Sequence, residues 1–101
     1  MTPDIIAKIT LYQMESGGRG GPTPSDQFGC LVEVNGEYFD CRIVLDRVGA
    51  LSPGQTAAVP IRFLRPDLVL PLLETCRNFR LWDRRVIGHG EVEQIVASHA
   101  S

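Results

Sequence analysis

Long apolar runs are absent from this sequence of 101 residues. The longest run, residues 68–73, has six residues and includes Pro71, whereas a membrane-spanning helix needs about 20 apolar residues. The amino end has no basic start, and Lys8 interrupts the stretch that would form the apolar core of a signal peptide. We therefore expect no transmembrane helix, no secretory signal and no membrane partner.

Cysteine and histidine are also scarce. The cysteines, Cys30, Cys41 and Cys76, are odd in number and lack the spacing of a metal site. At least one thiol must stay unpaired, which favours a reducing cytoplasm. The histidines, His89 and His99, are ten residues apart and have no carboxylate cluster beside them. The sequence thus predicts neither a metal site nor a cofactor.

Charge of one sign is not in large excess. Ten basic residues against twelve acidic residues give a net charge of −2, so the molecule as a whole offers no positive field for DNA. Nine of the ten basic residues are arginine and one is lysine. This bias is consistent both with the GC-rich codons of arginine and with local phosphate recognition, so it does not decide between them.

The composition is that of one globular domain. Hydrophobic residues make up 44% of the chain and charged residues 22%, a balance typical of folded proteins rather than disordered ones. A chain of this length has room for a single core, and the sequence shows no internal repeat or interdomain linker. Residues 1–101 are therefore expected to form one domain.

Apolar and polar residues alternate through most of the chain, which is the period of a half-buried strand. The Asn35-Gly36 pair lies between two alternating runs and predicts a two-residue hairpin turn, because both central positions of a type I′ turn need a positive φ. The pattern predicts six strands, over residues 5–12, 30–34, 38–45, 57–63, 79–82 and 86–96.

Three segments lack this alternation. Glycine and proline are concentrated in residues 16–28, which are expected to form a flexible loop. Residues 67–76 favour a turn or two of helix at most, because Pro71 prevents a longer one. The tail, residues 97–101, is expected to fray.

Glycine and proline also occur inside two predicted strands. Pro60 in the fourth strand predicts a bulge or a locally unpaired stretch, and Gly88 and Gly90 in the sixth predict sharp coiling or a close approach of another backbone. Six short strands with short connections favour a closed barrel, since closure removes exposed sheet edges. The predicted fold class is all-β, a small six-stranded antiparallel β-barrel.

The order of these signals resembles the C-terminal domain (domain III) of elongation factor Tu, a barrel of the translation-factor type. The opening strand runs into Gly17-Gly18-Arg19, where that family has Gly-Gly-Arg. The turn at residues 51–55 and the strand after it, which ends in Pro66, are similar to the family's Met-Pro-Gly-Asp turn and strand. Residues 79–90 are similar to its closing hairpin, which contains Arg-Thr-Val-Gly-x-Gly.

The resemblance implies a barrel whose relatives act as docking surfaces for RNA and protein partners. It does not imply GTP hydrolysis, because the phosphate-binding sequence Gly-x4-Gly-Lys-[Ser/Thr] does not occur. Asp83-Arg84 stands where the family has a Gly-Gly pair near its aminoacyl-tRNA contact, in a turn that is one residue shorter. The Asn35-Gly36 hairpin replaces a longer connection. These departures weaken the case for tRNA binding.

A basic hairpin is the strongest candidate for a binding site. Residues 77–85 carry a local charge of +3, and inward positions for Phe79 and Leu81 place Arg80 and Trp82 on the outer face. An arginine beside an exposed aromatic ring suits base stacking and also protein interfaces. The predicted partner-binding or RNA-binding residues are Arg19 in the glycine-rich loop and Arg80, Trp82, Arg84 and Arg85 in this hairpin.

Two alternatives remain open for these features. The arginines would be a solvated surface if they pair with Glu33, Asp40 and Glu91 across the barrel. Residues 68–73 would either cap one end of the barrel or dock on a partner or a second copy of the chain.

Catalytic chemistry has little support. There is no Gly-x-Ser-x-Gly motif, and a small hydrolase built on a pair such as Cys41 and His89 is a distant alternative, because cysteines at inward strand positions usually fill the core. No catalytic residue is therefore predicted. The expected function is a non-enzymatic binding module of the cytoplasm that docks on a protein partner, with structured RNA as the second choice of partner.

Overall fold

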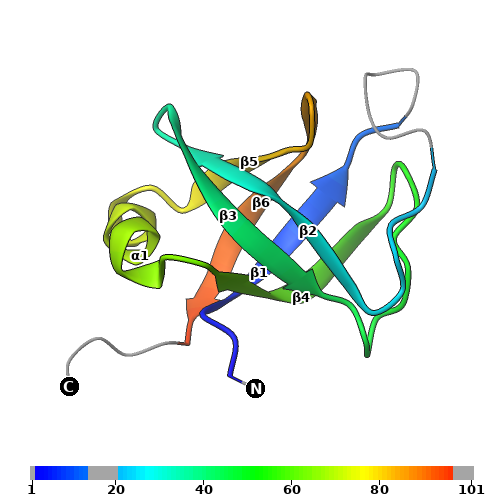
Figure 1. The fold of residues 1–101 in the computed structure, drawn as a ribbon, viewed down its shortest axis with the longest axis horizontal. Coiled ribbons are helices and arrows are strands. Elements are labelled where there is room, and N and C mark those ends of the chain that lie inside the picture. Colours follow the sequence, from blue (N-terminus) through cyan, green and yellow to red (C-terminus); the bar gives the residue numbers. More distant parts are fainter. Residues whose placement is uncertain (1, 14–20, 97–101) are drawn as a thin grey trace.

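The structure is a computed structural model that describes residues 2–13 and 21–96. It contains a closed barrel of six antiparallel strands, in the order β1-β4-β3-β2-β5-β6 around the barrel (Figure 1). The strands are β1 (Ile5–Leu11), β2 (Gln27–Val34), β3 (Glu37–Val44), β4 (Thr56–Phe63), β5 (Asn78–Trp82) and β6 (Val86–Ile95). The predicted fold class is confirmed.

The alternating side chains form the core, as the pattern predicts. In β1 every second residue is buried, and the same alternation continues through β2 and β4. The inward residues belong to one hydrophobic cluster that every strand contributes to. Burial of these side chains is the main favourable contribution to folding, at about 25 cal/mol for each Å² of apolar surface removed from water.

The β2–β3 hairpin has the predicted turn. Asn35 and Gly36 both have positive φ, 52° and 83°, and a Glu33 carboxylate oxygen accepts a hydrogen bond from the Gly36 backbone N–H at 3.0 Å. However, β2 begins at Gln27, three residues before the predicted start. The inward alternation extends to the buried side chain of Phe28, so the predicted loop over residues 16–28 is too long at its carboxyl end.

Residues 21–26 of that predicted loop are anchored to the barrel. Thr23 is buried, its backbone N–H donates to the Leu51 carbonyl oxygen at 2.9 Å, and its hydroxyl oxygen accepts from the Leu51 N–H at 2.9 Å. These two bonds fix the segment that leads into β2. Residues 14–20, which include most of the glycines of this loop, lie outside the described residues.

Pro60 causes no bulge, so that alternative of the prediction is wrong. The β1–β4 register runs through the Ile6–Pro60 pair without a shift. On its other side, β4 pairs with β3 only from Ile61 onward. Pro60 lies outside this pairing, so no hydrogen bond to β3 is lost through its missing N–H. The locally unpaired stretch is confirmed.

Two glycines of β6 allow close approach of neighbouring strands: the predicted approach of another backbone is found at Gly88, whereas side chains approach Gly90. A Cβ atom at Gly88 would lie 2.4 Å from the carbonyl oxygen of Thr10 in β1, and a Cβ at Gly90 would lie 2.4 Å from the ring of Phe79 in β5. Any larger residue would push β6 away from both neighbouring strands. These positions let the barrel close tightly on this side.

One helix, α1 (Pro66–Thr75), connects β4 to β5. The prediction that Pro71 limits helix here to a turn or two is wrong, since α1 has ten residues and contains Pro71. A proline inside a helix costs about 3 kcal/mol, but Val69, Leu70 and Leu73 are buried in the core and each contributes about 1.5–3 kcal/mol. Tertiary burial therefore outweighs the proline.

The helix lies beside the barrel near the end of β4 and the start of β5 (Figure 1). Its buried residues fit the capping interpretation of residues 68–73, whereas Leu68 is exposed. Within the described part of the chain, no helix has the length and hydrophobicity to cross a membrane. The tail predicted to fray, residues 97–101, lies outside the described residues.

Candidate functional site

The outward residues of β5 lie where the sequence predicts. Phe79 and Leu81 are buried in the core, so Arg80 and Trp82 are on the outer face. Strand β5 pairs with β2 through three residue pairs, among them Leu31–Trp82 and Glu33–Arg80. The outer faces of β2 and β5 therefore form one continuous surface.

An aromatic pair crosses this surface. The rings of Tyr38 in β3 and Trp82 in β5 are 5.8 Å apart between centroids, with an edge-to-face angle of 71°. Because β2 lies between β3 and β5, the two rings meet over the outer face of β2. Tyr38 is 54% exposed, whereas Trp82 is half-buried.

Arg80 forms an ion pair with Glu33 on this surface. Its Nε donates to a Glu33 carboxylate oxygen at 2.6 Å, and its Nη2 lies 2.5 Å from the same oxygen. The Glu33 side chain is only 11% exposed, so the pair holds a nearly buried carboxylate. The alternative in which the arginines pair with carboxylates of other strands is therefore correct for Arg80. The ion pair holds β5 against β2.

Arg84 and Arg85 remain exposed at the β5–β6 turn. The turn spans residues 83–85 and is closed by a hydrogen bond from the Asp83 N–H to the Arg85 carbonyl oxygen at 2.8 Å, so it is one residue longer than the predicted two-residue turn. Arg84 has a φ of 68°, a left-handed conformation that costs a non-glycine residue about 1–2 kcal/mol. In the described ranges, neither arginine forms an ion pair.

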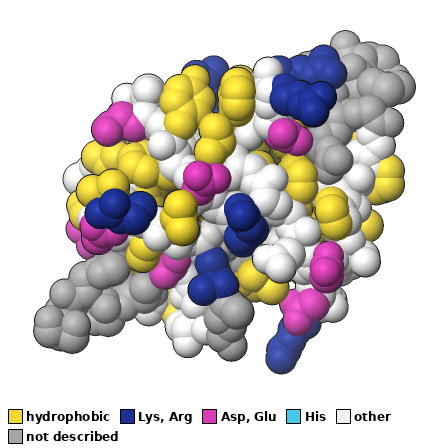
Figure 2. Space-filling model, viewed as in Figure 1, with side chains coloured by type: hydrophobic (Ala, Val, Ile, Leu, Met, Phe, Trp, Pro, Cys, Tyr) yellow, Lys and Arg dark blue, Asp and Glu magenta, His cyan; other side chains and the backbone are white. Residues whose placement is uncertain are grey.

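A shallow hollow of about 540 Å³ lies between Trp82 and the neighbouring strands. It is lined by Gly29, Cys30, Leu31, Asp40, Arg42, Trp82, Asp83 and Arg84. Figure 2 shows that hydrophobic side chains gather over α1 and along the adjacent edge of the molecule, with charged side chains between them. The hollow beside Trp82 thus combines apolar side chains with arginines. Arg19, the other predicted binding residue, lies outside the described residues.

We call the outward side chains Leu31, Tyr38, Trp82, Arg84 and Arg85 the aromatic face. The sequence analysis missed Tyr38 and Leu31. Their contact with Trp82 depends on the pairing of β2 with β5, which are more than 40 residues apart in the chain. Only the outward position of Tyr38, next to the hairpin turn, was a local signal.

Cys41 and His89, the pair considered for hydrolysis, do not come together. Cys41 is buried in the core, whereas His89 is on the outer face of β6, where its ring centroid lies 5.6 Å from that of Tyr12. Strands β3 and β6 are on opposite sides of the barrel. A Cys41–His89 hydrolase is therefore excluded by this geometry.

The thiols of Cys30 and Cys41 instead contact each other across the β2–β3 pair. Their sulfur atoms are 3.6 Å apart, in directly opposed positions of the register. The hydrogen bond with Cys41 raises the pKa of the Cys30 thiol far above its ordinary value, and burial raises it further. The Cys30 thiol is therefore neutral at physiological pH, and both cysteines are buried in the core.

No group of three or more His, Cys, Asp or Glu side chains that could hold a metal ion occurs within residues 2–13 and 21–96. No protein-family model matches the chain, and no curated protein has a similar sequence.

Proposed function

We propose that the chain is a non-enzymatic binding module that docks on a protein partner through the aromatic face. The observation that carries this proposal is the Tyr38–Trp82 pair on the outer strand surface, in which the Tyr38 ring is exposed and the Trp82 ring is half-buried. Tyrosine, tryptophan and arginine are the residues that contribute most to binding energy in protein interfaces.

The arrangement of the aromatic face supports a protein partner. Tyr38 and Trp82 restrain each other by packing edge to face, so little side-chain entropy remains to be lost on binding. Arg84 lines the hollow beside Trp82 and Arg85 is the next residue of the turn, so the two arginines would form the charged rim of an interface. The ion pair of Glu33 with Arg80 joins β5, which carries Trp82, to β2, over which the two rings meet.

The resemblance to domain III of elongation factor Tu gives this proposal its biological setting. We propose that the barrel is of the translation-factor type and that it works in the cytoplasm, which agrees with the free thiols of Cys30, Cys41 and Cys76. Domains of that type act as docking surfaces, and docking is the property carried over here; GTP hydrolysis is not.

Structured RNA is the second candidate partner. The observation that favours it is the exposure of Arg84 and Arg85 beside Trp82, with no carboxylate paired to either arginine in the described ranges. Arginine contacts phosphate, and an aromatic ring stacks on an unpaired base. The charges around this turn include Asp83 and Asp40, which oppose a polyanion and place RNA second.

Capture from a lysate of the source cell tests the proposal. The immobilised chain is expected to retain a protein whose recovery is unchanged by nuclease and depends only weakly on salt. Loss of all captured material after nuclease treatment, with a steep salt dependence from counterion release, would support RNA instead. Capture that is identical for the wild type and a Trp82→Ala variant would contradict docking through the aromatic face.

A further inference from the structure

Two free thiols touch each other inside the β2–β3 hairpin. Cys30 and Cys41 occupy directly opposed positions of the register, and their sulfur atoms are 3.6 Å apart. Both thiols are free and buried in the core. A disulfide bond is about 2.05 Å long, so the two sulfur atoms need only a small further approach to be joined.

The backbone spacing of this pair suits a disulfide. The two-residue turn at Asn35-Gly36 makes Val34–Glu37 a hydrogen-bonded pair, and such pairs recur at every second position along a hairpin. Cys30–Cys41 lies four positions from that pair in the register, so its Cα atoms are about 5.5 Å apart. Disulfides join Cα atoms about 4.4–6.8 Å apart. The two strands therefore need not slide or separate for the bond to form.

A disulfide at this position is expected to be reversible. The Cβ atoms of directly opposed residues are about 4.5–5.5 Å apart, whereas a relaxed disulfide prefers about 3.8 Å. The hairpin must draw in locally to close the bond, which strains it. Strained disulfides are reduced more readily than relaxed ones. The pair thus has the properties of a redox-sensitive site rather than of a permanent cross-link.

The hairpin that carries the two thiols is joined to the rest of the barrel over short distances. Strand β2 pairs with β5 through three residue pairs, and β3 pairs with β4 through three, whereas β2 and β3 pair with each other through eight. Elements with few contacts to their surroundings open at a lower free energy than the whole domain. Local opening of this hairpin therefore brings both thiols to solvent together.

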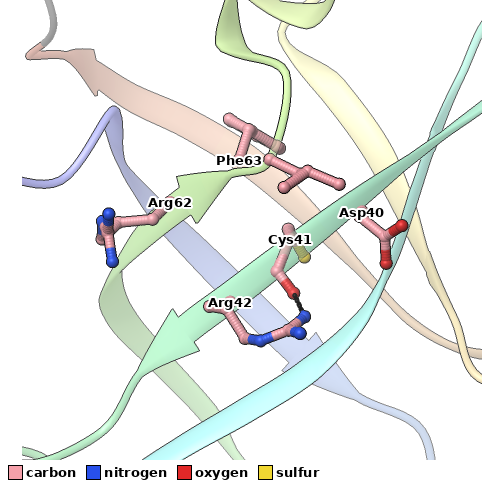
Figure 3. A pocket seen from close by; sticks show the side chains of 6 residues that line it. Asp40, Cys41, Arg42, Arg62 and Phe63 are labelled. Carbon is pink, nitrogen blue, oxygen red and sulfur yellow. Dashed lines mark hydrogen bonds between the residues drawn. The ribbon is translucent and has the colours of Figure 1, made fainter.

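The two cysteines also border hollows of the outer surface. Cys30 lines the hollow of about 540 Å³ beside Trp82, and Cys41 lines another of about 250 Å³ (Figure 3). Little of the structure thus lies between each cysteine and solvent, and a small uncharged oxidant needs only a limited opening to reach the sulfur atoms.

Arg42 covers the outer side of the pair. Its Nη1 donates to the Cys41 carbonyl oxygen at 3.1 Å (Figure 3), and its guanidinium lies against Gly29, the residue before Cys30. The hydrogen bond with Cys41 and burial raise the pKa of the Cys30 thiol, and the charge of Arg42 opposes this shift. Because the thiolate is the reactive form, we expect the closed hairpin to react slowly and the opened hairpin to react readily.

We propose that Cys30 and Cys41 are a modification site at which hydrogen peroxide forms a reversible cross-strand disulfide. One thiol loses its proton and its sulfur attacks a peroxide oxygen; the O–O bond breaks, leaving a sulfenic acid and one water. The second thiol loses its proton and its sulfur displaces the hydroxyl group as another water, which forms the S–S bond. The chain gives up two protons and two electrons, and the peroxide is reduced to two molecules of water.

This site is independent of the docking proposal, because neither cysteine belongs to the aromatic face. It agrees with the cytoplasmic compartment proposed above, where disulfides are typically transient and redox-sensing. The bond closes residues 30–41 into a loop and fixes β2 to β3, so oxidation is expected to suppress the local opening that admits the oxidant.

Mass spectrometry of the full chain after peroxide treatment tests the proposal. Catalase removes the peroxide, and the chain is then unfolded with a maleimide that labels free thiols. No Lys or Arg lies between the two cysteines, so trypsin leaves them in one peptide. We expect this peptide to lose two hydrogen atoms and to escape labelling, and dithiothreitol must restore both thiols. Cleavage after Glu33 or Glu37 then shows directly that Cys30 is linked to Cys41.

Cys76 is the internal comparison, since it lies just after α1 and its thiol donates to the Asn78 carbonyl oxygen at 3.4 Å. In the folded wild type we expect the Cys30–Cys41 disulfide, whereas in urea we expect pairings that include Cys76 as well. Full labelling of Cys30 and Cys41 under conditions that oxidise Cys76 overturns the proposal. So do pairings with Cys76 that are as frequent in the folded chain as in urea.

Two variants complete the test. Cys76→Ala must still form the disulfide, so that the number of labelled thiols falls from two to none and exchange through Cys76 is excluded. Cys41→Ala is expected to keep Cys30 labelled or to carry added oxygen there, without a loss of two hydrogen atoms. If Cys41→Ala fails to fold, Cys30→Ala replaces it. A Cys76→Ala protein that stays fully labelled after peroxide treatment overturns the proposal.

Discussion

Arg80 of β5 holds the nearly buried carboxylate of Glu33 in β2 through two contacts, 2.6 Å from Nε and 2.5 Å from Nη2. The β2–β5 pairing extends over only three residue pairs, and Glu33–Arg80 is at one end of it. The ion pair therefore acts where the barrel has few backbone hydrogen bonds between strands. It also sits beside the aromatic pair that we propose for docking.

Replacing Arg80 with alanine is expected to lower the free energy of unfolding by about 1–2 kcal/mol, because the Glu33 carboxylate loses its charged donor while it stays poorly solvated. Urea denaturation measures the change. Arg80→Glu must cost more than Arg80→Ala, since it places two carboxylates together. Arg85→Ala, at an exposed position without an ion pair in the described ranges, is the control and should change stability by less than about 0.5 kcal/mol. Equal effects of Arg80→Ala and Arg85→Ala would contradict a structural role for the ion pair.

Glycine in place of Arg84 is expected to stabilise the barrel. The φ of Arg84 is 68°, which glycine adopts without steric cost, and the gain is reduced by the greater entropy of glycine in the unfolded chain. The net expectation is an increase of about 0.5–1 kcal/mol in the free energy of unfolding, measured by urea midpoint. Arg85→Gly should give no such increase. A destabilised Arg84→Gly protein would show that the Arg84 side chain has a structural role that compensates for its backbone strain.

Alanine at Gly88 is expected to destabilise the barrel by about 2–3 kcal/mol, because the new Cβ would overlap a backbone oxygen of β1 that cannot move alone. Gly29→Ala is the matched control. There the nearest atoms are the end of the flexible Arg42 side chain, which can rotate away. Thermal unfolding of both variants compares them directly, and a Gly29→Ala protein that loses as much stability as Gly88→Ala would argue against a tight β1–β6 contact.

The Cys30–Cys41 contact predicts a loss of stability in alkali. The hydrogen bond with Cys41 and then burial raise the pKa of Cys30 in the folded chain, so above about pH 8.5 the unfolded thiol loses its proton while the folded one keeps it. Below that pH the Cys30 thiol does not change the free energy of unfolding with pH. Above it, the free energy of unfolding falls as pH rises, by at most about 1.4 kcal/mol per pH unit. Urea midpoints across this range should fall less steeply for Cys30→Ala than for the wild type and Cys76→Ala. Parallel curves would contradict this account.

Local pattern predicted the strands because each has a regular inward face. The Asn35-Gly36 turn and the close approach at Gly88 were also predictable, since only certain residues adopt those conformations. The ten-residue α1 was not predictable from the local sequence, because Pro71 disfavours a helix. The burial of leucine and valine side chains outweighs this cost, but it depends on a core that exists only after the barrel closes.

The candidate site was predictable only in part. Alternation placed Arg80 and Trp82 outward and left Glu33, Asp40 and Glu91 as possible partners of the arginines. It did not select Glu33 among these carboxylates, nor did it bring Tyr38 to Trp82. Those contacts arise where β2 pairs with β5, a long-range pairing that depends on the strand order of the barrel. For the same reason, local charge counting grouped Arg80 with Arg84 and Arg85, although Glu33 engages only the first of them in the described structure.

Affinity for the captured protein partner, compared between Trp82→Ala and Leu64→Ala, tests the docking proposal most directly. Both substitutions shorten a hydrophobic side chain, but Leu64 is 73% exposed and is not part of the aromatic face. With folding verified by circular dichroism, Trp82→Ala is expected to weaken binding about 30-fold, as loss of an interface hot spot of about 2 kcal/mol does, and Leu64→Ala should leave binding unchanged. Unaltered binding by a folded Trp82→Ala protein would contradict docking through the aromatic face.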